Sequence, residues 1–220
     1  MLDWLFQPQC AACTAPATTL CGPCRGSLVE LGAACGRCAE PGGELCARCR
    51  DAPLPLDRIV APWRFGGQLA IAIRRLKFGR RMHVARALAP LWAPLVAAAQ
   101  GDALVVPVPL HWRRRFTRGF DQAWLLARHA CALAELAAPV PVLRRVRPGP
   151  PQTSLTAAER RANLAGAFVA DRAVAGRAVV LVDDVVTTGA TFAAAAQALL
   201  DAGAVRVTGV AIARATSAPG

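Results

Sequence analysis

The feature that most constrains this sequence is a repeated cysteine pattern in its first 49 residues. Eight of the nine cysteines form four Cys-x-x-Cys pairs, and the segment CAACTAPATTLCGPC returns 25 residues later as CGRCAEPGGELCARC. Each copy places four thiols on two short turns, the number that a tetrahedral zinc ion needs. The repeat therefore predicts two duplicated units that fold around a metal, since each is too small to fold on a core of its own.

All eight paired cysteines are predicted zinc ligands, and we expect pairing within each repeat. Each unit then holds one zinc ion, although cross-braced pairing fits the same spacing. Because four thiolates fill a tetrahedral zinc ion, both ions are expected to be structural. The predicted ligands are Cys10, Cys13, Cys21 and Cys24 in the first unit, and Cys35, Cys38, Cys46 and Cys49 in the second.

Other uses of cysteine fit the sequence less well. A disulfide framework needs an oxidising compartment and usually follows a signal peptide, but the start, MLDWLFQPQC, lacks a basic segment and a long apolar core. Iron–sulfur ligands usually have other spacings. The ninth cysteine, Cys131, lies in an apolar helical stretch and is expected to be a buried small side chain. The expected location is the cytoplasm, where partner proteins could hold the chain at the inner membrane.

The composition excludes a disordered chain and a membrane-spanning one. A length of 220 residues suits one sizeable core plus a small module. The hydrophobic fraction is 55% and the mean hydropathy is +0.35. Nowhere do roughly 18 apolar residues follow one another without interruption, so no transmembrane segment is expected.

Beyond the cysteine repeats, the pattern predicts an α/β fold. Pro53 and Pro55 mark residues 51–57 as a linker between a zinc-ribbon module, residues 1–52, and a larger domain, residues 58–220. Strands alternate with helices there, which indicates a mostly parallel sheet covered on both faces. Strands are expected at 58–65, 139–146, 178–182 and 206–213, an apolar run at 103–110, and helices at 69–78, 84–100, 120–137 and 190–202.

The chemistry is concentrated in the segment VVLVDDVVTTGAT, residues 179–191. An apolar strand is expected to end in Asp183 and Asp184, which can accept hydrogen bonds from sugar hydroxyls. The loop that follows offers backbone N–H groups, hydroxyls and a helix N-terminus, which suit a phosphate monoester. The pattern predicts a ribose 5-phosphate site, while an ordinary turn with two exposed acids is the alternative. The predicted phosphate-loop residues are Thr187, Thr188, Gly189, Ala190 and Thr191.

This segment resembles the phosphoribosyl-pyrophosphate (PRPP) motif of type I phosphoribosyltransferases. Together with IRRLKFGRR, VPVPLHWRRRFTRGFDQA, PQTSLTAAERRANLAGAF and the twin cysteine repeats, it makes the chain similar to the ComF family along nearly its whole length. That bacterial, phosphoribosyltransferase-like group is linked to natural competence and the use of external DNA. The resemblance implies a type I phosphoribosyltransferase-like sheet and binding of PRPP with Mg²⁺. One departure is Asp121, where the family more often has Asn.

The resemblance also assigns two loops. Residues 110–119 take the place of the pyrophosphate loop, so its arginines are expected to face the diphosphate or its Mg²⁺, with a solvated basic loop as the alternative. These arginines are Arg113, Arg114, Arg115 and Arg118. Residues 147–166 take the place of a flap that closes over the reaction. Its candidate contacts are Gln152, Arg160, Arg161 and Asn163, although an amphipathic turn explains the two arginines nearly as well.

The positive charge is concentrated in one part of the sequence. The net charge is +12, and residues 58–118 contain twelve Arg and Lys residues against a single acid, Asp102. If these cations share a face, they form a surface that attracts phosphate groups. The interleaved aromatic residues could stack on bases of single-stranded DNA, or could be core residues among solvated arginines. They are Trp63, Phe65, Phe78, Trp112 and Phe116.

Three functions follow from these features. The first is a phosphoribosyltransferase that moves phosphoribose from PRPP to an acceptor, for which no general base is identified. Thr187 stands where purine-salvage members carry an acid, which disfavours hypoxanthine or guanine as the acceptor. The second is a competence factor that binds single-stranded DNA. The third is a regulator that senses PRPP or a nucleotide and docks other competence proteins through the ribbons.

Overall fold

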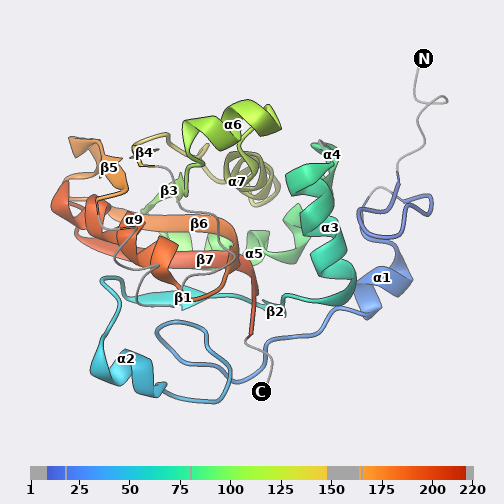
Figure 1. Ribbon diagram of the computed structural model, residues 1–220, viewed down its shortest axis with the longest axis horizontal. Coiled ribbons are helices and arrows are strands. Elements are labelled where there is room, and N and C mark those ends of the chain that lie inside the picture. Colours follow the sequence, from blue (N-terminus) through green and yellow to red (C-terminus); the bar gives the residue numbers. More distant parts are fainter. Residues whose placement is uncertain (1–8, 18, 80, 148–163, 165, 217–220) are drawn as a thin grey trace.

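A parallel sheet forms the centre of the molecule (Figure 1). The computed structural model describes residues 9–17, 19–79, 81–147, 164 and 166–216, with the backbone alone for 113–115. The sheet runs β1-β7-β6-β3, with β2 also paired to β7, and every pair in it is parallel. Its strands are β1 (Arg58–Val60), β2 (Trp63–Arg64), β3 (Leu104–Pro107), β6 (Ala178–Val186) and β7 (Arg206–Arg214). The predicted α/β class is confirmed.

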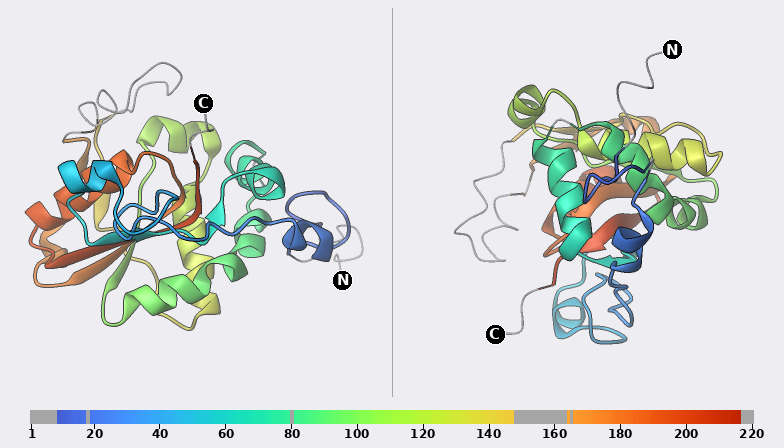
Figure 2. Two further views of the ribbon diagram at one scale, coloured as in Figure 1. Left: turned by 90° about the horizontal axis from the view of Figure 1, so that it is seen from below. Right: turned by 90° about the vertical axis from the view of Figure 1, so that its right-hand side faces the viewer.

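Helices connect these strands and cover the sheet (Figures 1 and 2). The longer ones are α3 (Gly67–Phe78), α5 (Ala93–Gln100), α7 (Gln122–Leu133) and α9 (Ala190–Asp201). The shorter ones are α1 (Gly22–Gly26), α2 (Ala47–Asp51), α4 (His83–Leu88), η1 (Ala89–Leu91), α6 (Trp112–Arg118) and η2 (Arg172–Val174). Within the described ranges, none of the helices is both long and apolar enough to cross a lipid bilayer.

Strand β6 shows how the sequence produces two buried faces. Its residues alternate between the faces of the sheet, as side chains of any strand do. Val180 and Val182 belong to the hydrophobic cluster that contains residues of α3, α4, α5 and α7. Val179 and Leu181 belong to the other cluster, with residues of α9. Because both faces are covered, residues 178–182 of the strand are apolar on both sides instead of alternating with polar residues, and Asp183 and Asp184 follow this run.

The two cysteine repeats have the same local structure. An isolated bridge joins Gln9 to Pro16 in the first repeat and Ala34 to Pro41 in the second, at positions 25 residues apart. The short helices α1 and α2 occupy equivalent places, and so do the left-handed residues Thr14 and Ala39, with φ of 68° and 58°. The duplication in the sequence is therefore a duplication of structure.

The repeats nevertheless lie at separate places on the molecule. In Figure 1, α1 of the first repeat lies beside α3, and α2 of the second repeat lies below β1. Cys10, Leu20 and Cys24 are buried in the cluster that contains α3 and α7. Cys35 and Cys38 are buried in the cluster that contains α9. Each repeat thus belongs to the hydrophobic cluster on a different side of the sheet. The division into domains at residues 1–52 and 58–220 stays a prediction.

Residues 51–57 form a packed connection and not a free linker. Leu54 and Leu56 are buried in the α9 cluster, and Asp57 N donates to Val207 O at 3.0 Å. The prolines explain the irregular backbone, because they remove donors. Two apolar side chains and this hydrogen bond fix the segment against the sheet.

The structure corrects the predicted strand at 58–65, the predicted helix at 84–100 and the predicted loop at 110–119. Pro62 interrupts the predicted strand 58–65, which becomes β1 and β2, and Pro90 and Pro94 divide the predicted helix 84–100 into α4, η1 and α5. The predicted basic loop at 110–119 is largely a helix, α6, because residues 112–118 contain neither Gly nor Pro. Gly119, with φ of 81°, follows its end.

A second, two-stranded sheet lies beside the main one. Its strands, β4 (Leu143–Arg145) and β5 (Phe168–Ala170), pair in antiparallel fashion. They border the segment predicted to be a flap. Most of that segment lies outside the described residues, including Gln152, Arg160, Arg161 and Asn163.

Candidate functional site

Each cysteine repeat gathers its own four thiols. The Sγ atoms of Cys10, Cys13, Cys21 and Cys24 all lie within 4.8 Å of one another, and those of Cys35, Cys38, Cys46 and Cys49 do the same. The structure therefore groups the ligands within repeats, as expected, and excludes cross-braced pairing. Cys131 is buried in α7, where burial raises the pKa of its thiol, and it belongs to neither group.

The geometry of each group fits a zinc ion. Backbone N–H groups of Ala12 and Cys21 donate to Cys10 Sγ at 3.4 Å, and Cys46 N donates to Cys35 Sγ at 3.4 Å. Burial opposes ionisation of Cys10, but such backbone donors outweigh it and lower its pKa to about 6. The same balance lowers the pKa of Cys35 to about 6. Burial raises the pKa of Cys24 and Cys49, so one thiol in each group ionises more readily than its neighbours. Four clustered thiols suit a closed, structural zinc site.

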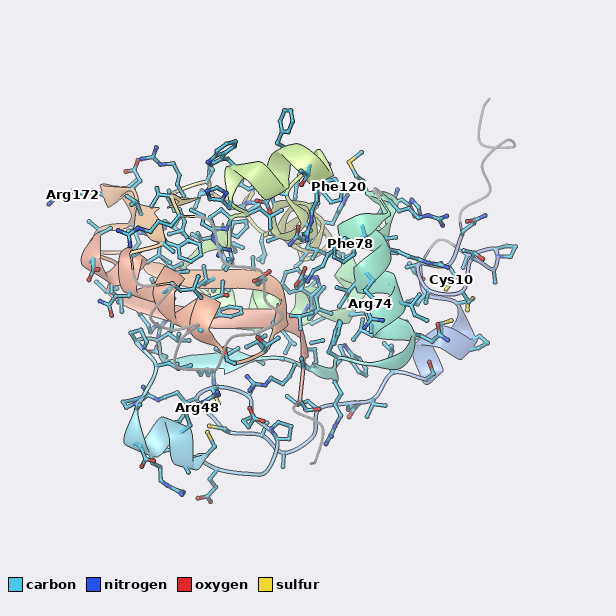
Figure 3. The ribbon with its side chains drawn as sticks, viewed as in Figure 1. Cys10, Arg48, Arg74, Phe78, Phe120 and Arg172 are labelled. Carbon is cyan, nitrogen blue, oxygen red and sulfur yellow. The ribbon has the colours of Figure 1, made fainter. Side chains whose placement is uncertain are left out.

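The second repeat is also tied to the end of β7 by a buried arginine. Arg214 is 1% exposed; its Nη1 donates to Cys38 O at 2.8 Å and its Nη2 donates to the carboxylate of Glu40. Arg48 Nη2 lies 3.9 Å from Glu40 and donates to Cys38 Sγ at 3.4 Å. Figure 3 shows Arg48 far from Cys10 of the first repeat. Among the described residues, the second repeat has this link to the end of β7 and the first does not.

A cavity of about 780 Å³ lies at the carboxyl ends of β3, β6 and β7. This is the edge at which open parallel sheets bind ligands. Its walls combine cations, carboxylates, hydroxyls and aromatic rings contributed by seven separate parts of the chain. Lining residues include Phe65, Arg74, Lys77, Phe78, Leu110, Thr117, Arg118, Gln122, Arg145, Asp183, Asp184, Thr187, Thr191 and Ala215.

Both predicted acids line the cavity, but they lie inside β6 and not after its end. The strand continues to Val186 because Asp183 pairs with Ala211 and Val186 pairs with Arg214 of β7. Asp183 Oδ1 accepts from the backbone N–H of Asp184 at 2.8 Å. By alternation, Asp184 continues the face of Val182 toward α3, where Lys77 Nζ lies 2.8 Å from its Oδ1.

One carboxylate oxygen of Asp184 has no partner in the part of the chain that the structure describes. Asp184 is 2% exposed, and its Oδ2 is buried without a hydrogen-bond partner among the described residues. A buried acceptor in this state is costly, so it calls for an explanation in terms of what the site holds. Carboxylate oxygens also suit Mg²⁺.

The pKa of Asp183 is raised to about 8. Burial is the main cause, and the negative charge of Asp184 adds to it, while Lys77 and the N–H of Asp184 act in the opposite direction. Removing water disfavours the charged form, and a second carboxylate close by disfavours it further. Acids with such shifts are typical of functional sites.

The predicted phosphate loop turns from β6 into α9 beside the acids. Thr187 and Thr191 line the cavity, and Thr188 Oγ1 accepts from Ala190 N at 3.3 Å. Gly189 has φ of 78°, and a Cβ there would lie 3.3 Å from Leu54 Cδ1. The turn therefore requires glycine for its backbone and for its packing on residues 54–59. It presents the N-terminus of a twelve-residue helix to the cavity.

Of the predicted pyrophosphate arginines, Arg118 lines the cavity. Its Nη1 donates to Gln122 Oε1 at 2.7 Å, and its guanidinium lies 5.1 Å from the ring centroid of Phe78. Arg113, Arg114 and Arg115 lie on α6, but their side chains are outside the described part of the structure.

Asp121 has a structural role that does not need an amide. Its Oδ1 accepts from the N–H groups of Ala123 and Trp124, which caps α7. Its Oδ2 accepts from Leu110 N at 2.9 Å. The carboxylate thus holds the segment after β3 against the start of α7, and both ends of that connection line the cavity.

Curated proteins with similar sequences identify the family. The DNA utilization protein YhgH of Escherichia coli O157:H7 is 37% identical over 161 residues, which span 70% of this chain and 71% of that protein. Its counterpart in Salmonella typhi is 38% identical over the same length. Competence protein F of Haemophilus influenzae is 33% identical over 144 residues, covering 61% of this chain and 63% of that protein. The chain belongs to the ComF family. No protein-family model matches it.

Several cavity residues of this ComF-family chain were not assigned to the site from its sequence. Lys77 and Arg74 come from α3, and Arg145 comes from β4. The sequence did distinguish Lys77 from the other cations, because it is the only lysine beside 25 arginines and lies in the segment IRRLKFGRR. Nothing in the sequence distinguished Arg145, since it is one of many arginines and its position depends on the pairing of β4 with β5.

The metal groups predict a zinc stoichiometry. We expect two zinc ions per purified chain by mass spectrometry of the metal content. Cys13→Ser should leave one, because it removes a ligand from the first group only. Cys131→Ser, at a buried cysteine outside both groups, should leave two. A wild-type value of one zinc ion would contradict the two-site assignment.

The shifted pKa of Asp183 predicts a pH-dependent stability. An unfolded aspartate ionises near pH 4, whereas folded Asp183 keeps its proton to about pH 8. Folding therefore loses stability through this group as the pH rises from about 4 to 8, and loses no more above that. Asp183→Asn removes the effect and keeps an oxygen for the N–H of Asp184.

The melting temperature of Asp183→Asn relative to wild type should accordingly increase between pH 5 and pH 8 and then level off. Differential scanning fluorimetry across this range measures it. Asp102→Asn, at an exposed aspartate away from the cavity, is the matched control. A constant difference between Asp183→Asn and wild type would show that Asp183 is not the shifted group.

Proposed function

We propose that this chain binds PRPP together with Mg²⁺ in the cavity at the carboxyl edge of its parallel sheet, and transfers phosphoribose in support of DNA utilization. The proposal rests on one observation above all. Asp184, whose Oδ2 is buried without a partner among the described residues, lines the same cavity as Thr187 and Thr191 of the turn that begins α9. A sugar phosphate with free hydroxyls is complementary to that combination.

The acids would bind the ribose. The two neighbouring hydroxyls of ribose 5-phosphate are hydrogen-bond donors, and Asp184 Oδ2 and the carboxyl of Asp183 are the acceptors that the cavity offers them. A hydroxyl on Asp184 Oδ2 would satisfy the unpaired buried atom. This gain explains how a chain could retain an otherwise costly acceptor.

The anionic groups would lie on either side of the ribose. Thr187, Thr191 and the N-terminus of α9 suit the 5-phosphate. Arg74, Arg118 and Arg145 give the rest of the wall a positive charge for the diphosphate. Asp183 and Asp184 are also the residues that would hold Mg²⁺, which when bound neutralises the diphosphate that leaves.

Catalysis by this cavity would come from positioning and charge more than from proton transfer. Among the described residues, its lining contains no histidine and no cysteine. The acceptor must therefore bring its own nucleophile, and the protein must hold the ribose and the departing diphosphate apart from water. Thr187 has no carboxylate with which to act on a purine base. The names of the relatives, DNA utilization protein and competence protein, favour an acceptor derived from nucleic acid.

Isothermal titration calorimetry with PRPP and Mg²⁺ tests the binding site. Wild type should bind, and the Asp183→Asn/Asp184→Asn double variant should bind at least about 100-fold more weakly, because the ribose loses its hydrogen bonds to both carboxyl groups. Asp201→Asn, at the far end of α9, is the matched control and should bind as wild type does. Absence of PRPP binding by zinc-loaded wild type would refute the proposal.

A second function, binding of single-stranded DNA, is supported by an exposed aromatic surface. Phe78, Trp112 and Phe116 are 73%, 63% and 86% exposed, and they lie on α3 and α6 beside the cavity. Exposed rings near arginines suit stacking on unpaired bases. The other two aromatics of the predicted set do not share this surface. Trp63 packs against the α3 cluster and donates to Leu91 O, and Phe65 packs on the same cluster.

Fluorescence anisotropy with a labelled single-stranded oligonucleotide tests this second function. Phe78→Ala/Phe116→Ala should weaken binding about tenfold through lost stacking, and affinity should fall steeply with salt. Val205→Ala changes a residue that is 66% exposed at the opposite edge of the sheet and should have no effect. Equal affinities for all three proteins would remove the aromatic surface from consideration.

A further inference from the structure

The chain's single lysine lies against the acid pair of the cavity. Lys77 is the only lysine among 26 basic residues. It comes from the last turn of α3, and its Nζ lies 2.8 Å from Asp184 Oδ1. The side chain of Lys77 is 23% exposed and that of Asp184 is 4% exposed, so the ion pair marks the boundary between the core and the cavity.

This contact satisfies only one oxygen of Asp184. The ammonium group of Lys77 supplies the counter-charge that a buried carboxylate needs. Asp184 Oδ2 remains without a partner among the described residues. The ion pair therefore stabilises the carboxylate and leaves its second oxygen without a partner in the part of the chain that the structure describes.

A lysine is well suited to an ion pair that breaks when a ligand binds. Its ammonium is a compact charge on a flexible stem, whereas the planar fork of an arginine favours two fixed, parallel bonds to a carboxylate. Arg74, which also lines the cavity, lies one turn earlier on α3. The stem of Lys77 can rotate between Asp184 and the cavity without any movement of α3.

We propose that Lys77 is a resident counter-ion that occupies Asp184 in the empty site and turns to the anionic part of the ligand when the ligand and its divalent cation bind. This inference rests on the proposed function. In the empty cavity, Lys77 neutralises Asp184. In the loaded cavity, its ammonium joins Arg74 and Arg118 around the negative groups of the ligand. Lys77 therefore opposes binding of a bare divalent cation and favours binding of a diphosphate.

Two titrations of the zinc-loaded full chain separate these effects. Electron paramagnetic resonance of free Mn²⁺ measures binding of the cation alone, and calorimetry with inorganic pyrophosphate and Mn²⁺ measures binding of the anion. Lys77→Met keeps the length of the side chain and removes its charge. It should bind Mn²⁺ about tenfold more tightly, because a positive charge next to the site is gone. It should bind pyrophosphate about tenfold more weakly.

Two variants serve as matched controls. Lys77→Arg keeps the charge and should bind Mn²⁺ within about threefold of wild type. Arg74→Met removes a charge from the same cavity but not from Asp184, so it should weaken pyrophosphate and leave Mn²⁺ binding within about threefold. Zinc content and thermal unfolding establish that each variant is folded, and Lys77→Gln replaces Lys77→Met if the latter is not.

The role proposed for Lys77 requires that Lys77→Met strengthen Mn²⁺ binding and weaken pyrophosphate binding. If Lys77→Met weakens both ligands, Lys77 is a structural brace for Asp184 and the proposal is wrong. Unchanged Mn²⁺ binding would also overturn it. If the opposed effects are found but wild type does not bind PRPP, the proposed function fails while the role of Lys77 stands.

Discussion

Parallel pairing of β6 with both β3 and β7 is the constraint on which the site depends. Because the pairing with β7 continues to Val186, Asp183 and Asp184 are held inside a central strand, where water cannot solvate them freely. Several features follow from that placement: the raised pKa of Asp183, the ion pair between Asp184 and Lys77, and the unpaired Oδ2 of Asp184. The same strand then turns at Gly189 into α9, which brings a helix N-terminus to the acids.

The cysteine repeats are equal in sequence and local structure but differ in what they contact. The first packs against the cluster of α3, from which Lys77 and Arg74 reach the cavity. The second is bonded to Arg214 at the end of β7, one residue before Ala215 of the cavity wall. The adjoining segment places Leu54 directly under Gly189. The two thiol groups thus lie on different sides of one site, which gives a physical reason for a duplicated unit in a chain of this size.

Much of the fold and part of the site were predictable from the sequence, for identifiable reasons. Cysteine spacing specified both thiol groups, since ligand number and geometry leave little freedom, and the segment 179–191 specified the acids and the phosphate turn. The sequence did not reveal that β6 runs through the acids, because strand pairing with β7 outweighs the local preference of Asp183 and Asp184 for a loop. Nor did it place Lys77 on Asp184, since that contact joins residues more than 100 positions apart and depends on how α3 packs. Helix α6 was not predicted because a run of arginines is typical of a basic loop, although residues 112–118 contain no Gly or Pro to interrupt a helix.

The most direct test of the account is a crystal structure of the zinc-loaded chain with PRPP and Mg²⁺. The account predicts the ribose hydroxyls at the carboxyl groups of Asp183 and Asp184, and the 5-phosphate at the turn formed by residues 187–191. It also predicts that Lys77 Nζ leaves Asp184 Oδ1 for the diphosphate. A ligand bound elsewhere, or one that enters the cavity with its ribose away from both acids, would contradict it.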